Sequence, residues 1–371
     1  MGRRILMLLA DEYRPDPRVR KEALALVEDG INVTILSWDR GHHHESRSEK
    51  EGLKIECVRT GKVYGLLKLG LNYPRFFLKA FGISRRMDFD SVHAHDLDTL
   101  LLGVAITRLK GVPLVYDAHE HYAAMVAGDV PPFFARVFDR LEAWALRYVD
   151  LLVTANSKIE EYLLPHLRSP RVNSVVVMNC IDYVDQTPTH RDHDGIIVFY
   201  SGSLESTRYV EDIALATLDI EDCTFKVAGD GPLRQRIEQL SKTQDRIIFM
   251  GYVPHQELLE SMIDIDLVAC LMDPSNENNK IGTPNKLFES MVLGVPVLVS
   301  EGTLSAEIAL EEGCGIAINW SEGDFKEAVE TIRDSRMRRE MGDNGRRAAR
   351  EKYNWGIMKK RLVDAYRSLS P

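Results

Sequence analysis

Residues 282–299 read GTPNKLFESMVLGVPVLV and combine the start of a helix with a short apolar strand. Pro284 suits the first turn of a helix, whose free N–H groups and positive dipole end favour a bound phosphate. Lys286 adds a positive charge there. Glu289, one turn further along the same face, has a carboxylate that can accept hydrogen bonds from a ribose or a sugar. A Lys–Glu pair on the surface of a capped helix is the alternative interpretation.

The same succession of helices and short apolar strands recurs along the whole chain. In the first half, apolar runs predict strands at 4–10, 31–37, 54–59, 90–94, 113–117, 150–155 and 174–178. Helical periodicity predicts helices at 17–29, 74–86, 97–109, 133–147 and 157–164. In the second half, strands are predicted at 195–201, 224–228, 246–250, 266–270, 296–299 and 314–318, followed by helical segments from 324 to 369.

Strands that alternate with helices require parallel sheets covered on both faces, so the sequence predicts two doubly wound α/β domains in tandem. The polar stretch 182–195 has the composition of an interdomain linker. We expect an N-terminal domain of residues 1–182, joined by a C-terminal helix over 355–371, and a C-terminal domain of residues 183–354.

Composition excludes several classes of protein. The chain has 371 residues, of which 44% are hydrophobic, and a net charge of −9, so it is neither globally disordered nor patterned to bind nucleic acid. No apolar run is long enough for a transmembrane helix. The five cysteines lie far apart, which favours free thiols in a reducing compartment over a disulfide or zinc framework. We expect a cytoplasmic protein without a nucleic-acid partner.

Ligands of doubly wound sheets bind at the carboxyl ends of the strands, and two glycine turns are predicted there. The turns Ser201–Ser203 and Gly229–Pro232 each follow a strand, so their backbone N–H groups can face an anion, although tight turns need glycine in any case. The loop after the first strand contains no G-x-G-x-x-G pattern, and a Walker A motif is absent. Both absences disfavour NAD enzymes and P-loop ATPases.

Taken together, the motifs resemble those of family 4 retaining glycosyltransferases with the GT-B fold, in which two Rossmann-like domains face a central cleft. The motifs that carry the resemblance are Pro284–Glu289, Leu293–Val297, Gly229–Leu233, Gly251–Pro254, Asp16–Glu22, His93–Asp96 and Tyr116–Glu120. They occur in order along nearly the whole chain. The resemblance implies an N-terminal acceptor-binding domain and a C-terminal domain that binds a nucleotide-sugar donor.

The resemblance also implies roles for individual residues. Glu289 would hold the nucleotide ribose, Lys286 would lie near the donor phosphates, and His119 would face the donor sugar and its β-phosphate from across the cleft. The other donor-binding residues would be Gly202, Ser203, Gly229, Gly231, Pro232, Tyr252, Val253, Thr283 and Asn285, with Tyr252 and Val253 beside the base. On the acceptor side, the expected residues are Arg18, His95, Asp96 and Glu120.

Two positions depart from the family pattern. The family often has two glutamates separated by seven residues, but Ile281 stands where the first is expected. Recognition of the sugar would then use Asn279, Thr283 and Asn285, or backbone amides. Ser203 replaces a cationic residue after the first strand of the donor domain, so we infer that Arg208 and Lys286 share the charge compensation of the diphosphate.

We expect neither a metal nor a cofactor. Cations and a helix N-terminus can stabilise a leaving nucleoside diphosphate on their own. Metal-binding Asp-x-Asp patterns occur at Asp88/Asp90, Asp96/Asp98, Asp192/Asp194 and Asp264/Asp266, and their number shows how unspecific they are. The tract 42–44, three histidines, is interpreted as solvated rather than metal-binding. Of His93 and His95 on one strand, we expect only one to reach the polar edge, with His93 as a satisfied core histidine.

A basic segment interrupts the acidic chain. Residues 59–86 contain seven cations and no acidic residue, interleaved with aromatic residues and leucines. The cations are Arg59, Lys62, Lys68, Arg75, Lys79, Arg85 and Arg86. This composition suits the surface of an anionic membrane, and equally a core-facing helix with a solvated basic side.

The function expected from the sequence is that of a metal-independent, hexosyltransferase-type glycosyltransferase. It would transfer a sugar from a nucleotide-sugar donor to a saccharide or a lipid-linked saccharide with retention of configuration, in the synthesis of a polysaccharide or glycolipid. The protein would then be peripheral on the inner face of the membrane. Two alternatives stay open: a nucleotide-sugar 2-epimerase on the same fold, and a non-catalytic sugar-nucleotide binding protein.

Overall fold

A computed structural model describes residues 2–13, 17–62, 66–126, 130–185, 194–262 and 264–369, and this chain forms two compact units. The first unit comprises residues 1–178 and 358–371, and the second comprises residues 179–357. The chain therefore passes to the second unit after Met178, rather than after residue 182 as expected. It returns to the first unit at Met358, within the last helix.

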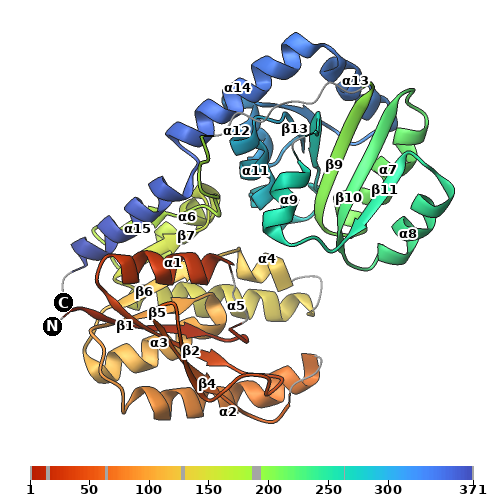
Figure 1. Ribbon diagram of the computed structural model, residues 1–371. Coiled ribbons are helices and arrows are strands. Elements are labelled where there is room, and N and C mark those ends of the chain that lie inside the picture. Colours follow the sequence, from red (N-terminus) through yellow and green to blue (C-terminus); the bar gives the residue numbers. More distant parts are fainter. Residues whose placement is uncertain are drawn as a thin grey trace. The chain divides into compact units, whose positions relative to one another are not determined.

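The first unit is an α/β unit around an eight-stranded sheet (Figure 1). Its strands are β1 (Arg4–Leu9), β2 (Asn32–Trp38), β3 (Arg47–Lys50), β4 (Leu53–Val58), β5 (Ser91–His95), β6 (Leu114–Ala118), β7 (Leu151–Thr154) and β8 (Asn173–Val176). Its helices are α1 (Pro17–Glu28), α2 (Leu66–Ser84), α3 (Leu97–Lys110), α4 (Tyr122–Val126), α5 (Pro132–Ala145), α6 (Ser157–Leu163) and the last helix, α15 (Trp355–Ser368). The strand order is β3-β4-β2-β1-β5-β6-β7-β8, and every pairing except β3 with β4 is parallel.

The second unit has a six-stranded parallel sheet in the order β11-β10-β9-β12-β13-β14. Its strands are β9 (Ile196–Ser203), β10 (Cys223–Asp230), β11 (Ile247–Gly251), β12 (Leu267–Cys270), β13 (Val297–Ser300) and β14 (Gly315–Ile318). Its helices are α7 (Val210–Leu218), α8 (Arg234–Thr243), α9 (His255–Ser261), α10 (Glu277–Ile281), α11 (Asn285–Leu293), α12 (Leu304–Glu311), α13 (Glu322–Arg333) and α14 (Ser335–Glu351).

Both sheets reverse their strand order at an internal point. In the first unit the order turns between β1 and β5, and in the second unit it turns between β9 and β12. In open α/β sheets, the crevice for a ligand forms at this switch point, outside the carboxyl ends of the strands. Two doubly wound Rossmann-like units, as the sequence predicts, therefore provide two such places.

Continuous apolar strands explain the cores. Ile5, Leu6, Met7 and Leu8 in β1 are each at most 1% exposed. A strand that is buried on both faces must be apolar at every position rather than at alternate ones. The same holds for Val297–Val299 in β13, which have no exposed area. This is why the short apolar runs locate most strands correctly.

Some elements differ from the prediction. Strand β3 was missed because its sequence, RSEK, is exposed at all four positions and carries no apolar pattern. Helix α2 begins at Leu66 rather than near residue 74. The prediction started the helix at Pro74, but the helix continues through this exposed proline. The short helices α4 and α10 were also missed, because five residues are too few to show helical periodicity.

Helix α14 packs closely on α11 through glycines. A Cβ on Gly342 would lie 2.2 Å from the carbonyl oxygen of Gly294, and a Cβ on Gly345 would lie 3.3 Å from the Cα of Met291. Gly294 itself ends α11 in the left-handed conformation, with φ 71°. The position of α11 therefore depends on the absence of side chains on the facing side of α14.

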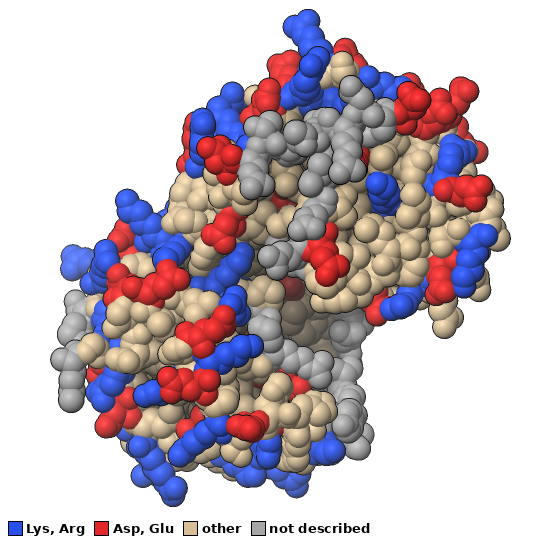
Figure 2. All heavy atoms as spheres, viewed as in Figure 1, with Lys and Arg blue, Asp and Glu red and all other residues tan. Residues whose placement is uncertain are grey.

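Charged side chains are mixed on the surface. Figure 2 shows Lys and Arg interspersed with Asp and Glu over the face in view, without one sign dominating it. Within the described ranges, no helix combines the length and the apolar character that crossing a bilayer requires.

We predict that Gly342→Ala destabilises the protein by about 1–3 kcal/mol, because the added methyl group forces α14 away from a backbone oxygen. Gly323→Ala is the matched control, since Gly323 is an exposed helical glycine whose added Cβ has no neighbour closer than 3.7 Å. The control gains helix propensity and raises stability by up to about 1 kcal/mol. Urea denaturation measures both changes, and equal effects of the two variants would contradict the packing argument.

Candidate functional site

The second unit contains a cavity of about 540 Å³. Its lining comes from the ends of β9 and β10, from the segment after β11 and from the start of α11, so it lies where the β9–β12 switch point predicts a ligand. The sequence-predicted residues that line it are Gly202, Ser203, Arg208, Gly229, Tyr252, Val253, Asn285, Lys286 and Glu289. The cavity thus brings together most of the predicted donor-binding residues.

Glycines let the ends of β9 and β10 approach each other. Gly202 and Gly229 are partners in the strand register, with φ values of 134° and 144°. A Cβ on Gly229 would lie 1.9 Å from the carbonyl oxygen of Gly202. Only glycine adopts this backbone without strain. The predicted turns are therefore strand ends that leave backbone exposed to the cavity.

Lys286 places a buried ammonium at the cavity. Its Nζ lies 3.5 Å from the centre of the Tyr200 ring, a cation–π contact. Lys286 is 8% exposed, and no ion pair or hydrogen bond joins its ammonium to another described residue. Burial lowers the pKa of Lys286 to about 8, and the nearby charge of Arg208 acts in the same direction. Such a cation gains most from an anionic ligand.

The first turn of α11 adds to this positive potential. Pro284 is the N-cap residue, with an extended backbone, and no side chain caps the helix. Pro284 and Asn285 line the cavity, so the uncapped end of the helix borders it. Glu289, one turn further on, is 3% exposed and also lines the cavity. The start of α11 therefore offers an anion site and, beside it, a carboxylate acceptor.

Other predicted donor residues do not line the cavity. Gly231 lies against Leu204, and a Cβ on it would approach the Leu204 backbone nitrogen to 2.7 Å, which gives it a packing role. Pro232 and Thr283 are outside the lining as well. Asn279 is buried, and its side-chain amide donates to the carbonyl oxygen of Asp273 at 3.0 Å.

Sequence reasoning missed the lining residues Tyr200, Ala228 and Leu258, whereas Ser201 and Asp230, which also line the cavity, belong to the two predicted glycine turns. Tyr200 carries the strongest signal in hindsight. It lies two residues before Gly202 on one strand, so both positions share a face of the sheet. Its hydroxyl donates to the carbonyl oxygen of Ser203 at 2.5 Å, which positions the ring beneath Lys286.

The first unit holds a buried charged cluster at its own switch point. Arg18, from α1, donates from Nε and Nη2 to the carboxylate of Asp117 at 3.1 and 2.6 Å. Its Nη1 donates to the carbonyl oxygen of Val177 at 2.6 Å, and Glu22 lies 3.1 Å from Nη2. Arg18 was predicted on the acceptor side, but its guanidinium is fully engaged inside the unit.

His119 lies between two carboxylates. Its Nδ1 is 3.0 Å from Oδ2 of Asp96, and its Nε2 is 2.8 Å from Oδ2 of Asp117. Burial opposes a charge on His119, but both carboxylates outweigh it and hold the pKa of the imidazole well above its usual range. The structure therefore presents an imidazolium whose side chain is 16% exposed.

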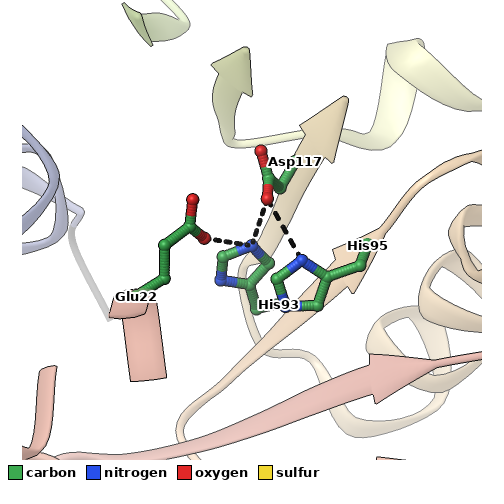
Figure 3. Close-up of side chains that lie close together, drawn as sticks. All are labelled: Glu22, His93, His95 and Asp117. Carbon is green, nitrogen blue, oxygen red and sulfur yellow. Dashed lines mark hydrogen bonds and ion pairs between the residues drawn. The ribbon is translucent and has the colours of Figure 1, made fainter. Parts of the chain in front are cut away.

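His93 and His95 correct one expectation. Their rings stack with centroids 4.2 Å apart, and both side chains point to the same side of β5 (Figure 3). We expected only one of them at this edge, but residues two apart in a strand share a face. His93 Nδ1 lies 2.6 Å from the hydroxyl of Tyr366, while its Nε2 has no hydrogen-bond partner among the described residues. Burial lowers the pKa of both imidazoles.

The remaining acceptor-side residues differ in exposure. His95 is 1% exposed and contacts Asp117, whereas Glu120 is exposed. Asp96 has a side chain that is 31% exposed and a backbone φ of 58°, a strained conformation for a residue with a side chain. Among the predicted acceptor residues, Asp96 and Glu120 are therefore the ones with side chains open to solvent.

Two residues of the Asp-x-Asp patterns take part in structural contacts. Asp90 accepts from Arg4, and Asp266 pairs with Arg338 at 3.3 Å. Asp192 lies outside the described residues, as does Asp16 of the first family motif. The histidine tract 42–44 contacts Thr60 and Glu12. Glu12, Asp39 and His44 lie close enough together there to be potential metal ligands.

Known proteins share this architecture. The model of Glycosyltransferase Family 4 matches residues 18–184, and that of Glycosyl transferases group 1 matches residues 196–334. The alpha-D-kanosaminyltransferase of Streptomyces kanamyceticus is 26% identical over 289 residues, which cover 71% of this chain and 72% of that protein. The glycogen synthase of Mycobacterium tuberculosis is 25% identical over 356 residues, 84% of each chain.

Solved structures show the same fold at low sequence identity. The sucrose-phosphate synthase of Thermosynechococcus elongatus superposes with a TM-score of 0.78 at 17% identity, over 99% of both chains. Anabaena HepE in complex with UDP-glucose has a TM-score of 0.72 at 14% identity, over 98% of this chain and 100% of HepE. With the two family models matching successive halves, the chain belongs to the family 4-like glycosyltransferases of the GT-B fold.

Proposed function

We propose that this glycosyltransferase binds a nucleotide-sugar donor in the cavity of the second unit and transfers the sugar, with retention of configuration, to a saccharide or lipid-linked saccharide. The observation that carries the proposal is the buried Lys286 ammonium beside the uncapped end of α11. The names of the relatives support it, since they include a kanosaminyltransferase and a mannosyltransferase, and HepE is solved with UDP-glucose.

The lining of the cavity suits the parts of such a donor. Glycines at the ends of β9 and β10 allow a diphosphate to approach the backbone, and Lys286 and Arg208 provide its charge compensation. Glu289 is the acceptor for the ribose hydroxyl groups. Tyr252, 76% exposed, offers an aromatic surface to the base.

In this proposal, the protein's own positively charged groups balance the negative charge of the leaving diphosphate. Two cationic side chains and a helix N-terminus are aimed at the place where negative charge develops, and such preorganised groups stabilise it without reorganisation. We therefore propose that the donor diphosphate binds without a metal ion, so that a chelator leaves nucleotide affinity unchanged in calorimetry. The role of His119 toward the donor sugar stays a prediction from the family resemblance.

We predict that a thermal-shift screen with UDP-, GDP-, ADP- and CMP-sugars identifies one nucleotide family. A ligand at about 100 times its Kd stabilises the native state by about 2.7 kcal/mol. Lys286→Ala and Glu289→Gln abolish the shift, because each loses a charged partner of the ligand. Lys280→Ala and Glu330→Gln, which break surface pairs with Glu277 and Arg333, retain it. No shift with any nucleotide sugar, or an equal shift in all variants, would contradict the donor site.

The low pKa of Lys286 predicts a pH dependence of binding. Below about pH 8 the lysine is charged in the free protein, and above it the lysine must take up a proton to bind the diphosphate. The affinity for the nucleoside diphosphate identified by the screen should therefore fall by up to about tenfold per pH unit above pH 8. Calorimetry between pH 7 and 9.5 measures it, with Lys286→Arg as a control that stays charged. A flat profile for the native protein would refute the assignment.

Helix α2 supports a further proposal, contact with an anionic membrane surface. Leu71 and Leu78 are 65% and 70% exposed, and Arg75 and Lys79 are exposed between and beside them. At this spacing the four side chains share one helix face. The apolar side chains can insert at the level of the lipid headgroups, and each nearby cation adds about 1 kcal/mol to the attraction to an anionic membrane. Such contact would suit a lipid-linked acceptor. The side chain of Lys68 lies outside the described residues.

We predict that the protein co-sediments with phosphatidylglycerol vesicles and not with phosphatidylcholine vesicles. The double charge reversal Arg75→Glu and Lys79→Glu should weaken this binding at least tenfold, because it replaces attraction by repulsion. Lys326→Glu with Arg336→Glu is the matched control, since both residues are exposed and the net charge changes equally. Binding that both double variants lose equally would point to net charge rather than α2.

A further inference from the structure

The buried cluster of the first unit contains four side chains that can bind a metal ion. They are Glu22 from α1, His93 and His95 from β5, and Asp117 from β6, and Figure 3 shows them turned toward one another. None is more than 1% exposed. One ligand atom from each lies within 4.8 Å of the others. This cluster belongs to a different unit from the donor cavity.

Several atoms of the cluster are left without a hydrogen bond. Both carboxylate oxygens of Glu22, Nε2 of His93 and Nε2 of His95 are buried and lack a hydrogen-bond partner among the described residues. A buried polar atom without a partner destabilises the folded state, so several such atoms in one place indicate a missing group. Glu22 has partial compensation through its ion pair with Arg18.

The geometry of His93 is that of a metal ligand held by a second contact. Its Nδ1 lies 2.6 Å from the Tyr366 hydroxyl, which fixes the ring, as an oxygen partner usually does for a metal-binding histidine. Its Nε2 lies 3.8 Å from Oε2 of Glu22 and 3.9 Å from Oδ2 of Asp117. His95 Nδ1 lies 3.1 Å from the same Asp117 oxygen. Ligand atoms around a tetrahedral zinc ion are about 3.3 Å apart, so small shifts would complete the site.

The charges around the cluster also favour a divalent cation. Glu22, Asp117 and Asp96 are three carboxylates in one contact network, and Arg18 supplies one positive charge. With both cluster imidazoles neutral and Arg18 and His119 charged, the three ionised carboxylates leave one net negative charge, which favours a bound cation. Arg18 is thus a counter-charge within the network rather than a full substitute for the ion.

We propose that Glu22, His93, His95 and Asp117 form a buried site for one divalent transition-metal ion, of which zinc is the type. Two imidazoles and two carboxylates form a donor set that suits zinc, cobalt or manganese better than calcium or magnesium, which prefer oxygen ligands alone. A bound ion would fix Asp117, and through it the orientation of His119, whose Nε2 lies 2.8 Å from Oδ2 of Asp117. The ion would be a positioning element for Asp117 and His119.

The test uses the full chain and zinc alone. The protein is incubated with zinc chloride, desalted, and analysed for metal by mass spectrometry, and cobalt(II) is added to a second sample to record its visible absorption. We expect one tightly retained zinc per native chain and the intense spectrum of four-coordinate cobalt. Glu22→Gln and His93→Gln should each lose the retained zinc and the cobalt spectrum.

His44→Gln is the matched control, because His44 belongs to the second potential ligand group, with Glu12 and Asp39. It should retain the zinc. Three results would overturn the proposal. They are loss of zinc only from His44→Gln, equal retention of zinc by His93→Gln and the native chain, and absence of zinc from the native chain. Circular dichroism checks that the variants fold, and if one does not, the cobalt spectrum of the native chain decides between imidazole ligation and no bound ion.

Discussion

A buried ammonium at a sheet switch point is the feature on which the candidate donor site depends. Lys286 lies 3.5 Å from the Tyr200 ring centre and has no ion-pair partner among the described residues. Burying a charge without a partner is costly, and proteins keep such a group where a ligand completes it. The glycine pair of β9 and β10 keeps side chains out of the adjoining space. In the proposed donor site, backbone conformation and electrostatics would both favour the same anion.

The first unit has the opposite excess of charge at its own switch point, where negative groups outnumber positive ones. There, three carboxylates are collected around histidines, and the single guanidinium of Arg18 compensates them in part. One consequence is a charged His119 at the margin of the cluster. The other is a set of unsatisfied atoms on Glu22, His93 and His95, which distinguishes this cluster from an ordinary buried ion pair. The two units therefore present sites of opposite character on one kind of sheet.

The sequence predicts the parts of the structure that depend on local pattern. Continuous apolar runs such as residues 5–8 locate the buried strands, and the stretch from Pro284 to Val299 contains helix α11 and strand β13. Strand β3 was not predicted from the sequence, because its pairing with β4 needs no apolar side chain.

The contacts of the histidine cluster were not predicted from the sequence, because they join segments that are far apart in the chain. Tyr366 reaches His93 across 273 positions in the chain, since α15 returns to the first unit. Tyr200 was missed for a different reason, because its role depends on the orientation of Lys286 above it. Motif position identifies the neighbourhood of a site, but side-chain partners follow from tertiary packing.

The most direct test of the central claim is a crystal structure of the chain with the nucleotide sugar that stabilises it. The account predicts the diphosphate at the N-terminus of α11, with a phosphate oxygen within hydrogen-bond distance of Lys286 Nζ and a ribose hydroxyl on Glu289. A nucleotide bound elsewhere, or one whose diphosphate points away from Lys286 toward solvent, would contradict it.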